Sequence, residues 1–153
     1  MEVRIIEGKR MSIVGSVSTG ATVGDIDIEK LWSEFLTHLD AIEHRVEGTT
    51  YEIHQWDETV GKHSCMTGVE VTKIDDVPLH LLLKRLPDCR YAVFTHHFSD
   101  GGYREAYRRI DEWLESSQYV MANDFDIQCY DERFQGPEHP ESVVELRIPI
   151  RAR

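Results

Sequence analysis

The sequence lacks any long apolar run. No stretch approaches the roughly 18 uninterrupted apolar residues that a membrane helix needs, and residues 1–10 hold no apolar signal-peptide core. Cysteine is also scarce: Cys65, Cys89 and Cys129 lie far apart and form no CxxC pair, so neither a disulfide framework nor a structural zinc site is indicated. These absences predict a cytoplasmic protein with reduced thiols and no membrane partner.

Basic residues are outnumbered. Seventeen Lys and Arg against 28 Asp and Glu give a formal net charge of -11, which would repel a phosphate backbone, so no direct nucleic-acid partner is expected. The 153 residues, 41% of them hydrophobic, are typical of one globular domain with a real core. No GxSxG, P-loop or GxGxxG motif occurs, so serine-hydrolase, NTPase and dinucleotide chemistry are not indicated and no cofactor is expected.

An internal repeat organises what is present. Residues 51–58 match residues 125–132 in the order aromatic, acid, Ile, polar, any residue, aromatic, Asp, Glu, at an offset of 74. An amphipathic helical pattern precedes each of these strands, and a β-prone run, 10–14 or 90–94, precedes each helix. The apolar stripes of the two helices are Leu31, Trp32, Phe35 and Leu39, and Ala106, Tyr107, Ile110 and Leu114.

The repeat predicts the fold class. Each half reads as strand, helix, strand, strand, over approximately 2–74 and 79–150, with a break at 75–78 (DDVP). We therefore expect an α+β protein with a single domain, 1–153, built of two pseudo-symmetric repeats. Its curved antiparallel sheet would carry the helices on one side and a ligand groove on the other.

Strand alternation predicts which residues face that groove. In the last strand the apolar set Val144, Leu146, Ile148 and Ile150 would pack under a helix, which leaves Glu145 on the groove side. The same alternation places Tyr130 and Gln128 beside Glu145, and His54 and Trp56 beside Glu70. Two carboxylates with two aromatic faces suit an organic cation.

Simpler interpretations stay open for each of these residues. Glu70 and Glu145 would also fit the solvent-facing positions of alternating strands, and Trp56 and Tyr130 would also fit packing positions at the sheet edge. Arg147, two residues from Glu145, would neutralise the site if the two side chains paired.

Four segments in order carry a resemblance to a known family: 90–96 (RYAVFTH), 112–114 (EWL), 124–127 (DFDI) and 144–150 (VELRIPI). Together they resemble the GyrI-like small-molecule-binding family. That family also supplies the effector-binding domain of AraC-type and MerR-type multidrug-responsive bacterial transcription regulators. The resemblance covers nearly the whole chain and is strongest from about residue 79.

The resemblance implies a function and a set of site residues. The family fold is two pseudo-symmetric units around a ligand groove, and the acidic residue that contacts cationic lipophilic ligands falls on Glu145. The aromatic pocket walls fall on Trp56, Tyr130, Phe94 and Trp113. We therefore expect capture of lipophilic or aromatic cations, for sensing or for sequestration, by a monomer or homodimer. Because one effector domain fills 2–150, we also expect no DNA-binding domain.

Other functions remain as alternatives. Some stand-alone family members are hydrolases of electrophilic small molecules, and Glu145 would then be the general base. Others modulate DNA gyrase, so a protein partner, either gyrase or a regulator, is a third interpretation. A metal site would require His54, His63 and Cys65 to meet in space. Neither His38 with His44 nor His96 with His97 has ligand spacing, and no metal is expected.

Overall fold

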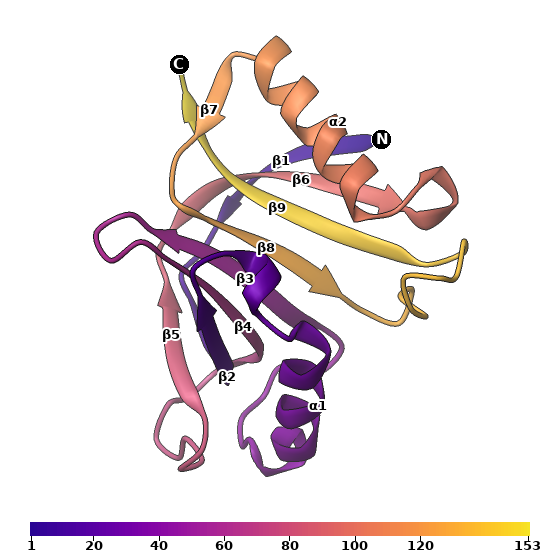
Figure 1. Ribbon diagram of the computed structural model, residues 1–153. Helices are drawn as coiled ribbons and strands as arrows, with labels where there is room; N and C mark the ends of the chain where they lie inside the picture. Colours follow the sequence, from indigo (N-terminus) through magenta and orange to yellow (C-terminus); the bar gives the residue numbers. More distant parts are fainter.

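The computed structural model describes all residues 1–153 and is built on one strongly curved antiparallel sheet (Figure 1). The strands are β1 (Glu2–Gly8), β2 (Met11–Gly20), β3 (Thr50–Asp57), β4 (Lys62–Val71), β5 (Leu82–Leu86), β6 (Cys89–His97), β7 (Tyr119–Met121), β8 (Phe125–Tyr130) and β9 (Val143–Ala152). Two α-helices, α1 (Ile28–His38) and α2 (Tyr103–Ser116), complete the α+β fold, which confirms the predicted class. Neither helix has the length and apolar character needed to cross a membrane.

The sheet is symmetric about its centre. Its order is β1-β6-β9-β8-β3-β4-β2-β5, with β7 beside β9, and Ile53 faces Ile127 where the two halves meet. The predicted order of strand, helix, strand, strand is confirmed as β2, α1, β3, β4 and as β6, α2, β8, β9. The edge strands β1 and β5 were not predicted; β1 pairs with β6 and β5 with β2, so each half donates an edge to the other.

The two helices begin differently. The side chain of Asp27 accepts a hydrogen bond of 3.0 Å from the backbone N–H of Lys30, which caps α1. By contrast, α2 starts after Gly102, which offers no side-chain cap, and Asp100 lies too early in the chain to occupy the cap position.

Both faces of the sheet are apolar. On one face, α2 packs over Phe94 and Leu146, and α1 packs over Val14 and Val69. On the other face a second core joins residues of strands from both ends of the sheet, and its buried members are Ile13, Tyr51, Ile53, Met66, Leu86, Tyr91, Val93, Phe125, Ile127 and Cys129. The curvature closes the sheet around this second core. The prediction that the ligand groove lies opposite the helices is therefore wrong, because a buried core occupies most of that face.

Candidate functional site

The main cavity lies on the helical side of the sheet, between α1 and α2. Its volume is about 1010 Å³, at the upper end of the range usual for small-molecule sites. The helices supply Trp32, Leu36, Tyr103 and Tyr107 as walls. The central strands supply the floor, made of Glu52, His54, Asp126, Gln128 and Tyr130. Both halves of the repeat thus contribute to one site.

The walls are aromatic and their hydroxyl groups are linked. Trp32 meets Tyr130 edge to face, with ring centroids 5.5 Å apart and planes at 89°. The Tyr103 and Tyr130 hydroxyls lie 2.6 Å apart, and the Tyr130 hydroxyl donates to Gln128 Oε1 at 2.5 Å. Gln128 Nε2 donates to the Tyr107 hydroxyl at 3.1 Å. Burial raises the pKa of Tyr103 to about 12, so this hydroxyl stays protonated at neutral pH.

Glu52 places a carboxylate at the floor of this aromatic cavity. The residue is only 5% exposed, and both of its oxygens have partners. Trp32 Nε1 donates to Oε1 at 2.6 Å, and His54 Nε2 lies 2.6 Å from Oε2. A buried charge is tolerated only when it is paired and hydrogen-bonded, and Glu52 meets both conditions.

His54 connects Glu52 to a second histidine. Its Nδ1 lies 3.1 Å from Nε2 of His63. Burial lowers the pKa of His54, but the hydrogen bond that His54 donates to Glu52 and the charges of Glu52 and Asp126 outweigh burial, and the pKa is raised overall. The pKa of His63 is lowered by burial and by the charge of His54. These opposite shifts make His54 the more readily protonated of the two histidines.

Asp126 is the second buried acid of the floor. It faces His54 across the β3–β8 pair, and its Oδ1 is buried without a hydrogen-bond partner. Burial raises its pKa, while the charge of His54 and the hydroxyl of Tyr107 act in the opposite direction. A buried carboxylate oxygen without a partner is unfavourable, so a ligand that offered a cation or a donor there would gain free energy.

The lining as a whole is acidic. It contains one arginine, Arg45, against six carboxylate residues: Glu29, Glu47, Glu52, Asp126, Asp131 and Glu132. A cleft lined mainly by one sign of charge attracts ligands of the opposite sign.

Two of the predicted site residues, Tyr130 and His54, line the cavity. Trp56 does not: it lies near the end of β3 and is 39% exposed. Phe94 is fully buried beneath α2 and meets Trp113 edge to face with ring centroids 5.3 Å apart, so this pair packs the core outside the cavity lining.

The two predicted acids lie on the other face of the sheet. Glu145 pairs with Cys129, and Leu146 pairs with Gln128, so the prediction that Gln128 and Tyr130 share a face with Glu145 is wrong. Glu70 and Cys65 are an odd number of residues apart on β4, so their side chains point to opposite faces of the sheet. Because Cys65 is the cross-strand partner of His54, Glu70 faces away from His54 and the cavity. The inference failed because Ile127 and its buried neighbours belong to the core away from the helices.

Glu145 is held by two arginines. Its Oε1 lies 3.0 Å from Nη2 of Arg4, and its Oε2 lies 3.2 Å from Nη2 of Arg133. Pairing with Arg147 was the alternative weighed from the sequence, and it does not form; the buried Nε of Arg147 has no hydrogen-bond partner. Two nearby guanidinium groups compensate the Glu145 charge outside the cavity lining.

Residues that the sequence interpretation left out complete the floor and walls. Glu52 and Asp126 occupy the acid position that the repeat aligns, and Trp32 and Tyr107 occupy equivalent positions of the two helices. The sequence does contain a pattern that indicates these site residues: an acid and an aromatic residue recur at matching positions of the two halves. It was missed because the helical aromatics fit equally well on an apolar stripe.

Comparisons with known sequences agree with this architecture. The model of one family, the GyrI-like small molecule binding domain, matches residues 1–151. The transcriptional regulator BrlR of Pseudomonas aeruginosa is 31% identical over 156 residues, which cover 98% of this chain and 56% of that protein. The chain therefore spans about half the length of this curated relative.

Several solved structures share the fold. SAV2435 bound to tetraphenylphosphonium has a TM-score of 0.75 at 15% identity, covering 99% of this chain and 94% of that one. The C-terminal domain of EcmrR has a TM-score of 0.73 at 11% identity, covering 99% and 98%. A hydrolase from Listeria innocua has a TM-score of 0.61 at 14% identity, covering 98% and 92%.

Proposed function

Because this chain belongs to the GyrI-like small molecule binding domain family, we propose that its cavity binds lipophilic aromatic cations. The observation that carries the proposal is the buried Glu52 carboxylate at the floor of an aromatic cavity with an acidic lining. The likeness to SAV2435, whose structure holds tetraphenylphosphonium, supports this class of ligand.

The physical argument rests on desolvation. A lipophilic cation leaves water at little cost because its charge is spread over apolar groups, and its rings can pack against Trp32 and Tyr130. The Glu52 carboxylate then attracts it in an environment where charges are poorly screened. Asp126 adds a second attraction from the same floor.

Binding without hydrolysis is the form of the proposal that we favour. Glu145, the base that a hydrolase would have used by analogy, lies outside the cavity lining and pairs with Arg4 and Arg133. The 31% identity to a transcriptional regulator supports a role in effector sensing, and sequestration of a toxic compound requires the same reversible binding. We propose no gyrase contact, because no feature of the cavity favours one.

The test uses two ligands of the same shape and opposite charge. Calorimetric titration should show that tetraphenylphosphonium binds and that tetraphenylborate does not. Glu52→Gln should weaken binding of the cation by about 1–3 kcal/mol, the cost of leaving a buried charge without its partner. Glu145→Gln is the matched control and should leave the affinity unchanged.

Two results would contradict the proposal. Equal binding of the cation and the anion would show that the acidic floor does not select the ligand. Loss of affinity in Glu145→Gln but not in Glu52→Gln would move the site to the other face of the sheet. Chromatography of the recovered ligand, with an ester-bearing aromatic cation included, tests for hydrolysis.

A further inference from the structure

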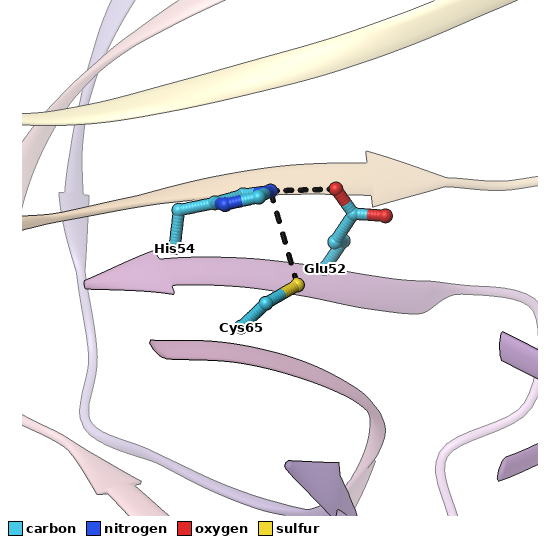
Figure 2. A group of neighbouring side chains, drawn as sticks. All are labelled: Glu52, His54 and Cys65. Carbon is cyan, nitrogen blue, oxygen red and sulfur yellow. Dashed lines mark hydrogen bonds and ion pairs between the residues drawn. The ribbon is translucent and has the colours of Figure 1, made fainter. Parts of the chain in front are cut away.

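Three potential metal ligands of different chemistry meet beside the cavity floor (Figure 2). Glu52 and His54 are two residues apart on β3 and so share a face, and Cys65 lies directly opposite His54 on β4. One carboxylate oxygen, one imidazole nitrogen and the sulfur all lie within 4.8 Å of one another. The hairpin therefore brings together side chains whose spacing in the sequence, 52, 54 and 65, resembles no metal motif.

We infer that Glu52, His54 and Cys65 bind a divalent transition-metal ion of the zinc class. Zinc accepts one thiolate, one imidazole and one carboxylate, and a site with three protein ligands keeps a fourth position for water or another ligand. Both Glu52 and His54 line the cavity, so this fourth position opens toward it. The inference does not rest on the proposed cation binding, but the two ligands would compete because both use Glu52.

Two of the three distances between ligand atoms are close to those that such a site requires, and all three atoms lie within 4.8 Å of one another. His54 Nε2 lies 2.6 Å from Glu52 Oε2 and 3.9 Å from Cys65 Sγ. Tetrahedral coordination at ordinary zinc bond lengths separates the ligand atoms by about 3.3–3.7 Å. The nitrogen and oxygen must move apart, and the nitrogen and sulfur together, by less than about 1 Å. Side-chain rotation provides such a change without movement of the strands.

The surrounding hydrogen bonds already orient the ligands. Trp32 Nε1 holds Oε1 of Glu52 at 2.6 Å, which leaves Oε2 directed at His54. His63 Nε2 lies 3.1 Å from His54 Nδ1, and this contact leaves Nε2 as the coordinating nitrogen. Hydrogen bonds of this kind to the remote atoms of ligating side chains are a regular feature of metal sites.

The charge around the cluster favours a divalent cation. Asp126 faces His54 from β8, so a second carboxylate lies beside the cluster in addition to its own member Glu52. Cys65 is 0% exposed and packs with Ile26 and Leu31, which keeps bulk water away from the sulfur side. The apolar side of the cluster limits access of solvent, and the acidic side adds negative charge that attracts a cation.

The experiment titrates the metal-free full chain with Zn²⁺ and with Co²⁺. Equilibrium dialysis with elemental analysis should give one ion per chain, and Co²⁺ should produce the near-ultraviolet charge-transfer absorption of a thiolate ligand. Cys65→Ser should abolish that absorption and weaken Zn²⁺ binding by at least tenfold. Cys129→Ser is the matched control, because Cys129 is another buried thiol on the opposite face, and it should retain both properties.

A second variant keeps the test decisive if Cys65→Ser does not fold. His54→Gln should weaken Zn²⁺ binding by at least tenfold and shift the Co²⁺ absorption while Cys65 remains in place. Absence of stoichiometric binding to the wild-type chain, or binding and absorption that both variants leave unchanged, would overturn the inference.

Failure of the metal site can be told apart from failure of the proposed function. Cys65 does not line the cavity, so metal-free Cys65→Ser should bind tetraphenylphosphonium as the wild type does. Metal binding without organic-cation binding would support the metal site and contradict the proposed function. Organic-cation binding without metal binding would do the reverse.

Discussion

The two halves of the molecule share a topology but differ in chemistry at equivalent positions. The first half has Glu52 and His54 on β3, and the second has Asp126 and Gln128 at the matching positions of β8. When the two halves are aligned so that Glu70 matches Glu145, Cys65 matches Pro140, which precedes the start of β9. The second half therefore has no cysteine at the position equivalent to Cys65. The repeat thus supplies two acids to one cavity, and only the first half adds an imidazole to that cavity and a buried thiol beside it.

The two acids also differ in their hydrogen bonds. Glu52 has partners on both oxygens, whereas Oδ1 of Asp126 has none and burial raises the pKa of Asp126. Burial disfavours the charged form of Asp126. The pseudo-symmetric site is therefore electrostatically unequal, and the first half should carry most of the attraction for a cation.

The largest expected change in stability comes from substitutions in the core, and it tests whether the two halves contribute equally there. Ile53 and Ile127 face each other at the centre of the sheet, and each is 1% exposed. Ile53→Ala and Ile127→Ala should each lower the free energy of unfolding by about 2–5 kcal/mol, through lost burial and the cavity left behind. Urea denaturation measures both, and a difference of more than about 2 kcal/mol between them would show that the core is not shared equally.

A smaller effect should separate the two helix starts. Asp27→Ala should lower the free energy of unfolding by about 0.5–2 kcal/mol, because the capping bond to the Lys30 N–H is lost. Asp100→Ala should cost less, because Asp100 makes only a 3.8 Å contact with Arg109 at the protein surface. Thermal unfolding of both variants gives the order, and the opposite order would contradict the capping assignment.

The smallest expected effect is a pH dependence of stability that comes from Glu105 on α2. Side-chain hydrogen bonds from Arg108 and Arg109 lower the pKa of Glu105 to about 2. A carboxyl group whose pKa is depressed in the folded protein stabilises the fold at pH values above its ordinary pKa. This stabilisation is lost as the pH falls toward 2. Urea midpoints measured between about pH 5 and pH 2.5 should fall slightly less in Glu105→Gln than in the wild type. If the urea midpoints of the wild type and of Glu105→Gln fell equally with pH, Glu105 would not contribute to the pH dependence of stability.

The order of the elements could be predicted because the repeat doubles each weak pattern. Aromatic, acid and Ile recur at 51–53 and 125–127, and each recurrence fixes a strand in relation to a helix. The edge strands β1 and β5 could not be predicted, because their pairing with the opposite half depends on contacts distant in the sequence.

The facing of the site residues could not be predicted, for a specific reason. Glu52 lies between Tyr51 and Ile53, and Glu145 lies between Val144 and Leu146, so both acids alternate with apolar neighbours. Alternation separates the two faces of a strand but does not say which face meets the helices. Only the register between β8 and β9 resolves this, and it places Glu145 away from the cavity.

The metal ligands show the same limit. The spacing of Glu52 and His54 on one strand was visible, and the third ligand, Cys65, depends on the β3–β4 register. A one-residue change in that register would turn the thiol to the opposite face and remove the cluster.

The most direct test of the central claim is calorimetric titration of tetraphenylphosphonium into the wild type, Glu52→Gln and Asp126→Asn, with all three proteins metal-free. The account predicts saturable binding to the wild type, a loss of about 1–3 kcal/mol in Glu52→Gln and a smaller loss in Asp126→Asn. Unchanged affinity in Glu52→Gln would contradict the claim that this buried carboxylate recognises the cation.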